Sequence, residues 1–259
     1  MVSIIIPTYN RAEIISETIS LVLNQTYSDL EVIVVSDGPS DDTRKAVEVF
    51  TDSRMKYYEI AHSGRPAVPR NYGIRKSSGE YIAFCDDDDS WEPEKLKLQM
   101  DKFSKDRDLG LVYSQCLIES REKNDIVPRD GKQGFIFKEL FLSYNFISNS
   151  TVLIKKEVFD TVEFFDEDMR FKATEDFDLW LRIAKKYKIG FVDKPLVIHG
   201  ESIDSISKGV WIKVIKYYLV ASKLFSEKQV GIGLFTKGLL SIFCKTVLRL
   251  GGNYRLRKY

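Results

Sequence analysis

The sequence has no apolar run of the roughly 18 residues that a membrane-spanning helix needs. It also lacks the charged and then apolar segment of a secretory signal, because Met1 leads directly into the apolar run Val-Ser-Ile-Ile-Ile. Only three cysteines occur, without CxxC spacing, which argues against a disulfide framework and against a zinc site. We therefore expect a cytoplasmic protein in which each cysteine is a small buried apolar residue.

Acidic residues are almost absent from the end of the chain. Residues 208–259 contain eleven Lys or Arg and one acid, Glu227, which leaves 28 basic and 37 acidic residues in positions 1–207. This change of charge predicts a domain over residues 1–207 and a basic tail over residues 208–259. Within the tail, the apolar residues of Val230–Leu250 surround a stripe of polar and basic residues at spacing four, which is typical of a basic amphipathic helix.

Two placements of this helix fit the sequence. Its stripe of Lys237, Ser241, Lys245 and Arg249 would be attracted to an anionic membrane, and the protein would then lie peripherally on the inner face of the cell membrane. Alternatively, the helix packs on the domain or in the interface of a homodimer. We expect no nucleic-acid partner.

In the rest of the chain, short β-branched runs alternate with segments whose apolar residues recur at helical spacing. Strand–helix–strand units of this kind predict an α/β fold with an open, mostly parallel, Rossmann-like sheet flanked by helices. Ligands then bind at the carboxyl ends of the strands. The predicted strands are Ser3–Pro7, Glu31–Ser36, Met55–Ile60, Tyr81–Cys85, Gly110–Gln115, Ser150–Ile154 and Gly190–Val192, and the predicted helices are Ala12–Asn24, Asp41–Phe50, Pro69–Lys76, Pro93–Phe103 and Glu175–Tyr187.

The most specific feature is a run of four aspartates, Asp86–Asp89, directly after the predicted strand Tyr81–Cys85. Adjacent carboxylates repel one another, and the low dielectric at the end of a buried strand increases that cost. A hard cation with oxygen ligands offsets the repulsion, and such cations usually also hold substrate phosphates. The position at a strand end therefore predicts a site for Mn²⁺ or Mg²⁺ rather than a solvated acidic turn.

Five segments, in their order along residues 4–180, together resemble family 2 glycosyltransferases. The resemblance implies a GT-A fold, with a nucleotide-sugar-binding half over residues 1–109 and an acceptor half over residues 110–207. The segments are Phe84–Trp91, which is similar to the DxD stretch; Ile6–Asn10, which resembles the PxYN-type opening; Val34–Gly38, which is similar to VDDGS with Ser36 in place of the first acid; Pro69–Gly73, which resembles ARNxG; and Thr174–Trp180, which resembles ED-x-D-L-W.

The resemblance implies that most of these residues bind a nucleoside-diphosphate sugar together with a divalent metal. Asp88 would bind the Mn²⁺ or Mg²⁺ that bridges the diphosphate, and Asp37 would accept the ring N–H of the base, with uracil favoured over thymine and guanine. His199 matches the place of a YRxH-type segment near the metal, although Val197 replaces its usual arginine. His62 is expected to be an ordinary loop residue. The other implied donor-binding residues are Pro7, Thr8, Tyr9, Arg70, Asp86 and Asp87.

Asp176 is implied as the catalytic base of an inverting transfer to a hydroxyl of a saccharide or lipid-linked saccharide, in bacterial-type surface polysaccharide or glycolipid synthesis. Its predicted place near a helix N-terminus would keep the carboxylate ionised. Two alternatives remain open. A nucleotidyltransferase also has strand-end aspartates, but the glycine-rich phosphate loop that it normally carries after the first strand is missing. A non-catalytic sugar-nucleotide-binding protein would have no use for Asp176.

Overall fold

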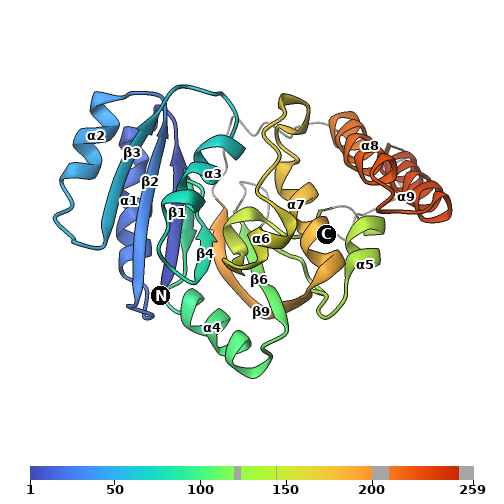
Figure 1. The fold of residues 1–259 in the computed structure, drawn as a ribbon, viewed down its shortest axis with the longest axis horizontal. Coiled ribbons are helices and arrows are strands. Elements are labelled where there is room, and N and C mark those ends of the chain that lie inside the picture. Colours follow the sequence, from blue (N-terminus) through green and yellow to red (C-terminus); the bar gives the residue numbers. More distant parts are fainter. Residues whose placement is uncertain (120–123, 144, 200–209, 251–259) are drawn as a thin grey trace.

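The structure, a computed structural model, describes residues 1–119, 124–143, 145–199 and 210–250. In this part of the chain a central sheet lies between two sets of helices (Figure 1). The predicted boundary near residue 207 and the end of the predicted tail, residues 251–259, lie outside the described residues.

The sheet has nine strands within the described residues, in the order β3-β2-β1-β4-β8-β6-β9-β5, with β7 paired to β6. The α/β fold is confirmed, but parallel pairing is limited to β1 to β4 and to β6 with β9. The remaining pairs are antiparallel. A short apolar run such as that of β8 does not specify the direction of its strand, which is why the sequence did not reveal these pairs.

The element bounds agree with most of the predicted segments, and six short elements and α8 are additional. The strands are β1 Val2–Thr8, β2 Leu30–Asp37, β3 Met55–Ile60, β4 Tyr81–Phe84, β5 Asp89–Trp91, β6 Leu109–Ile118, β7 Asp125–Val127, β8 Leu153–Lys155 and β9 Lys188–His199. The helices are α1 Ala12–Leu23, α2 Asp41–Glu48, α3 Ala67–Lys76, α4 Lys95–Lys105, α5 Phe137–Ser143, α6 Val158–Val162, α7 Glu175–Lys186, α8 Val210–Ser226 and α9 Ile232–Leu250, with the single turns η1 Asn149–Thr151 and η2 Met169–Phe171.

Side chains along each strand alternate between two apolar cores. Ile4 and Ile6 of β1 lie in the core that includes residues of α1, α2 and α4, whereas Ile5 lies in the core that includes α3, α5, α6, α7 and α8. Because both faces of the sheet are covered, β1 and β2 read in the sequence as continuous apolar runs rather than as alternating ones.

Parallel pairing brings three strand ends to one edge of the sheet. Thr8 at the end of β1 pairs with Ser36 of β2, and Ile5 pairs with Phe84 at the end of β4. The residues that follow these strands therefore lie close together, and they include most of the side chains that the sequence singled out.

The C-terminal helices α8 and α9 lie side by side at the end of the molecule that is farthest from β3 (Figure 1). Tyr217, Val220 and Leu224 of α8 are buried in the same core as α5 and α7. The charge boundary at residue 207 therefore does not coincide with a break in the hydrophobic core, and the division of the chain there stays a prediction.

Helix α9 is the helix predicted for Val230–Leu250, and part of its polar stripe faces the domain. Ser241 Oγ and Lys245 Nζ both donate to the carbonyl oxygen of Leu142 in α5, at 2.8 and 3.1 Å. Neither α9 nor any other helix in the described part of the chain combines the length and hydropathy needed to cross a bilayer. Cys244 is exposed on α9, which corrects the expectation that all three cysteines are buried.

Replacing Leu224 by alanine should lower the free energy of unfolding by about 2–5 kcal/mol, because this side chain is completely buried in the shared core. The matched control is Leu240→Ala on α9, where the side chain is 62% exposed and the expected change is within about 0.5 kcal/mol. Urea denaturation of both variants measures the difference. Equal effects would show that α8 is not part of the domain core.

Candidate active site

The acidic run forms a tight turn between β4 and β5, and every carboxylate in it has a cationic partner. The repulsion among the adjacent carboxylates, which we expected a metal ion to offset, is therefore already reduced by side chains of the protein. The pairs are Asp86 with Arg70, Asp87 and Asp88 with Arg11, and Asp89 with His199.

Arg70 is a buried bridge between the acidic turn and α7. Its Nη2 donates to Asp86 Oδ1 at 2.7 Å, and its Nη1 donates to Glu175 Oε1 at 2.8 Å. Burial alone would lower the pKa of Arg70, but the charges of Asp86 and Glu175 outweigh burial and raise it. Burial would likewise raise the pKa of Asp86, but the charge of Arg70 holds it below its usual value.

Both terminal nitrogens of Arg70 bind carboxylates, and the implied contact of Arg70 with a donor stays a prediction. A guanidinium in low dielectric pairs most strongly with the charges nearest to it, and here these are Asp86 and Glu175. A guanidinium has five N–H donors, and the Nε of Arg70 is buried without a hydrogen-bond partner, so donors remain beside these two carboxylates.

Arg11 is the cation on the open side of the turn. Its Nη1 donates to Asp87 Oδ1 at 2.9 Å and to Asp88 Oδ2 at 2.7 Å. Asn10 precedes it with a φ of 52°, a left-handed conformation in which the chain turns between β1 and α1. The side chain of Asp88 is 30% exposed and that of Asp87 only 9%, so Asp88 is the more accessible of the two to an ion from solvent.

The oxygens around the turn fit a hard cation that also binds phosphate. Asn149 Nδ2 donates to Asp86 Oδ1 at 3.1 Å, while Asn149 Oδ1 is buried without a hydrogen-bond partner. Burial raises the pKa of Asp87 to about 6, so additional positive charge would favour its ionised form. Among the described residues, no three His, Cys, Asp or Glu side chains form a complete metal site. A metal ion here would therefore need oxygen ligands from water or phosphate, as Mg²⁺ commonly does.

Tyr9 and His62 form an aromatic pair beside Asp37. Their ring centroids lie 4.2 Å apart with the planes inclined by 20°, and Tyr9 is 46% exposed. The Asp37 carboxylate accepts hydrogen bonds from the backbone N–H groups of Ser63 and Gly64 and from the Ser63 hydroxyl, at 2.8 to 2.9 Å. A carboxylate has about four lone-pair sites, so these three bonds leave about one acceptor position, on a side chain that is only 8% exposed and has His62 Nδ1 at 3.4 Å from its Oδ2.

The glycine that follows β2 allows the aromatic pair to lie close to the sheet. Gly38 has a φ of +134°, and a Cβ at this position would meet both Tyr9 and His62 at 3.4 Å. Pro7 and Thr8 belong to the end of β1, directly before Tyr9. They position the loop that carries Tyr9, and their own contacts with a donor stay predictions.

Asp176 lies in the first turn of α7 and is partly exposed. Its Oδ1 accepts from the backbone N–H of Phe177 at 2.7 Å, and its Oδ2 accepts from Asn145 Nδ2 at 2.8 Å. Its neighbour Glu175 is only 4% exposed and binds Arg70 and the backbone N–H of Thr174. Of the two adjacent acids, Asp176 is therefore the one that an acceptor can reach.

Burial and the negative charge of Glu175 raise the pKa of Asp176 to about 7. These two effects oppose the helix macrodipole, which was expected to keep Asp176 ionised. A carboxylate with a pKa near 7 is well matched to accepting a proton at neutral pH.

His199 is the cross-strand partner of Asp89 in the β5–β9 pair. Its Nδ1 is hydrogen-bonded to Asp89 Oδ1 and its Nε2 to Ser148 Oγ, the latter at 2.7 Å. Burial alone would lower the pKa of His199, but the hydrogen bond and the charge of Asp89 raise it to about 11. Both ring nitrogens of His199 thus have partners within the protein, Asp89 and Ser148, and its role as a metal ligand stays a prediction.

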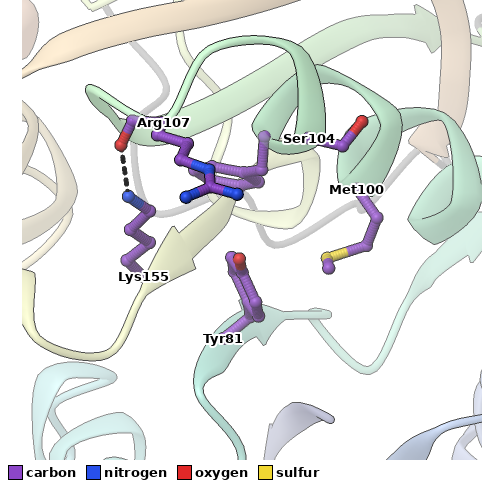
Figure 2. Close-up of a pocket in the computed structure, with 6 residues that line it drawn as sticks. Tyr81, Met100, Ser104, Arg107 and Lys155 are labelled. Atoms are coloured by element: carbon purple, nitrogen blue, oxygen red, sulfur yellow. Dashed lines mark hydrogen bonds between the residues drawn. The ribbon is translucent and has the colours of Figure 1, made fainter.

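A surface cavity of about 290 Å³ lies away from these residues, between α4 and the start of β4 (Figure 2). Its lining includes the rings of Tyr81 and Phe103 and the cations Arg107 and Lys155, whose Nζ donates to the carbonyl oxygen of Arg107 at 2.5 Å. Tyr81 begins β4, whereas the acidic run follows the end of that strand. No carboxylate lines the cavity, so the acidic edge of the sheet remains the candidate active site.

Several residues of this site were not predicted from the sequence, among them Arg11, His62 and Asn145. The sequence offered a signal for a site role of Arg11, because this residue directly follows the segment Ile6–Asn10. His62 lies just after the end of β3, at the edge where ligands are expected, and this position was a weaker signal. Asn145 lies 31 residues before Asp176 in the sequence, and no local pattern predicts the contact between them.

Comparisons with known proteins bear on this site. The family model of glycosyl transferase family 2 matches residues 3–163. The UDP-Glc:alpha-D-GlcNAc-diphosphoundecaprenol beta-1,3-glucosyltransferase WfgD of Escherichia coli is 34% identical over 210 residues, which cover 79% of this chain and 80% of that protein. An uncharacterized glycosyltransferase of Rickettsia felis is 31% identical over 199 residues, and the match covers 75% of this chain but only 32% of that protein. The chain thus spans about a third of the length of this relative.

Two solved structures have a similar fold. TarS 1-349 of S. aureus in complex with UDP-GlcNAc has a TM-score of 0.71 at 19% identity, covering 86% of this chain and 66% of that chain. The mannosyltransferase PcManGT from Pyrobaculum calidifontis, in complex with GDP-Man and Mn²⁺, has a TM-score of 0.68 at 18% identity, covering 98% of this chain and 76% of that chain. These likenesses show the GT-A-type α/β fold, and the family model shows that the chain belongs to glycosyl transferase family 2.

Proposed function

We propose that the protein is an inverting glycosyltransferase that moves a sugar from a nucleoside-diphosphate sugar to an acceptor hydroxyl. The observation that carries this proposal is the Arg70 bridge, in which one guanidinium binds both Asp86 of the acidic turn and Glu175 beside Asp176. A diphosphate at the turn and an acceptor at Asp176 would therefore lie next to each other.

The donor is proposed to be a UDP-sugar. The base stacks on the exposed ring of Tyr9, and its ring N–H donates to the remaining acceptor position of Asp37. The UDP-GlcNAc complex of TarS and the UDP-Glc in the name of WfgD support uracil over guanine, although PcManGT binds GDP-Man. The acceptor is proposed to be a saccharide or a lipid-linked saccharide in bacterial-type surface polysaccharide or glycolipid synthesis, as the diphosphoundecaprenol in the name of WfgD suggests.

Asp88 is proposed to hold Mn²⁺ or Mg²⁺, because it is the more exposed partner of Arg11 in the acidic turn. When bound, such an ion supplies positive charge to the diphosphate oxygens of the leaving group. Asp86 and Asp87 shape the turn, and Arg70 keeps Asp86 ionised. The Mn²⁺ in the PcManGT complex supports a divalent metal.

Asp176 accepts the proton of the acceptor hydroxyl while the oxygen forms a bond to the anomeric carbon. The bond from that carbon to the diphosphate oxygen breaks on the opposite face, and its electron pair leaves with the nucleoside diphosphate. No covalent enzyme intermediate forms, so the configuration inverts. Asn145 holds one carboxylate oxygen of Asp176, which fixes the direction of the other.

Asp176→Asn should lower turnover by the roughly 10²–10⁴-fold typical of losing a general base, because it keeps the size of the side chain and removes its basicity. The affinity for UDP should stay within a few-fold of the wild-type value, because the proposed nucleoside contacts lie at β1 and β2 and not on α7. Release of UDP from a panel of UDP-sugars, with and without saccharide acceptors, measures turnover. A fully active variant would refute the mechanism and favour a non-catalytic binding protein or another base.

Glu175→Gln is the matched control for this experiment. Its main effect should be on stability, because it removes the charge that faces the buried Arg70, and turnover of the folded protein should fall less than in Asp176→Asn. The reverse ranking of the two variants would move the base to Glu175.

Asp88→Asn should weaken UDP binding in the presence of Mn²⁺ by about tenfold or more, as expected when a metal ligand is lost, and should leave binding in EDTA nearly unchanged. Asp42→Asn, an exposed acid on α2, is the control and should change neither. Isothermal titration with and without metal makes the comparison. Undiminished metal dependence in Asp88→Asn would show that another group holds the metal.

A further inference from the structure

The outer side of the α8–α9 hairpin is apolar. Of the fourteen large hydrophobic side chains that are exposed among the described residues, nine lie between residues 211 and 247. Most of them are separated by three, four, seven or eight residues, which places them along one side of each helix. The outer face comprises Trp211, Ile212, Ile215, Tyr218 and Phe225 from α8, and Ile232, Leu240, Phe243 and Val247 from α9.

This outer face is not the side by which the helices pack on the domain. Tyr217 and Leu224 anchor α8 in the core, and Leu239 and Ile242 pack α9 against it. The α8 anchors lie on the side of that helix away from its exposed stripe, given 3.6 residues per turn. On α9 the side opposite the stripe carries Ser241 and Lys245, which face the domain, and Leu239 lies at the border between the two sides. Among the described residues, core packing therefore leaves the outer face uncovered, and an apolar surface of this extent marks a contact with another apolar phase or partner.

Basic residues outnumber acidic ones in the sequence that contains the outer face. Residues 208–259 contain eleven Lys or Arg and one acid, the exposed Glu227. Of these cations, Lys223 and Lys245 bind the domain and do not face outward. Lys228 between the helices and Lys237 on α9 are exposed. Cations around a face that includes a tryptophan and a tyrosine complement an anionic lipid bilayer, where aromatic rings favour the headgroup level and each cation adds to the attraction.

We propose that the outer face is a membrane-docking surface, with α8 and α9 lying in the plane of an anionic bilayer and their apolar stripes among the lipids. This reverses the side predicted from the sequence, because Ser241 and Lys245 of the polar stripe bind Leu142 of the domain. Contact is interfacial, since no described helix is suited to crossing the bilayer. The proposal adds a partner to the proposed function and holds whichever sugar is transferred.

Sedimentation of the full chain with vesicles tests the docking surface. Vesicles of phosphatidylcholine with phosphatidylglycerol should bind the protein at least about fivefold more tightly than vesicles of phosphatidylcholine alone, which is roughly the effect of one cation near the surface. The combined variant Ile215→Ala, Leu240→Ala and Phe243→Ala should reduce binding by about tenfold or more, because it removes exposed apolar area. The matched control combines Ile126→Ala, Val49→Ala and Phe135→Ala, which are exposed elsewhere, and should bind as the wild type does.

Failure to bind anionic vesicles, or equal binding by the two combined variants, would overturn the proposal. If light scattering without lipid shows a wild-type dimer and a monomeric outer-face variant, and vesicle binding is absent, the outer face is a subunit interface instead. Thermal shift by UDP with Mn²⁺ should be the same in wild type and both variants. This readout shows that the variants are folded, and it separates failure of the docking surface from failure of the proposed function.

Discussion

The active site depends on one buried guanidinium. Arg70 is 6% exposed and holds two carboxylates from segments more than 80 residues apart in sequence, Asp86 at the end of β4 and Glu175 at the start of α7. Burying three charges together is unfavourable unless each is paired and hydrogen-bonded, and removing one partner of such a group commonly costs about 3–5 kcal/mol. The position of α7 relative to the parallel sheet is therefore coupled to the protonation of this cluster.

The same coupling explains why two adjacent acids behave differently. Glu175 forms an ion pair with Arg70, whereas Asp176 has the uncharged Asn145 as its side-chain partner. The charge of Glu175 and burial raise the pKa of Asp176 to about 7, so the site contains one structural acid and one titrating acid on the same helical turn. On the donor side, Arg11 provides the positive charge that the acidic turn needs before any ligand binds.

The sequence predicted the features that depend on local patterns. The apolar runs of β1 and β2, the helical spacing of α1 and the acidic run after β4 were all read correctly, because each is fixed by neighbouring residues. Partners that meet through tertiary packing were not accessible in this way. The sequence predicted His199 near a metal ion, and only the β5–β9 pairing shows that Asp89 is its cross-strand partner.

The C-terminal helices show a related limit. The spacing of Lys237, Ser241 and Lys245 correctly predicted a helix, but the sequence could not say which of its sides meets the domain. The carbonyl group of Leu142 accepts hydrogen bonds from two residues of the polar stripe, and this leaves Leu240, Phe243 and Val247 outward. Strand direction in the second half of the sheet is hidden for a similar reason, since short apolar runs are the same in either direction.

The assignment of Asp176 as the base is tested most directly by the pH dependence of kcat/KM for donor turnover, which reports the ionisation of the free enzyme. Only the ionised carboxylate accepts a proton, and burial with the charge of Glu175 places its pKa at about 7. With metal held saturating, kcat/KM should therefore rise by roughly tenfold per pH unit below pH 7 and level off above it. A profile that is flat from acid to neutral pH, or that falls as the pH rises through 7, would contradict this assignment.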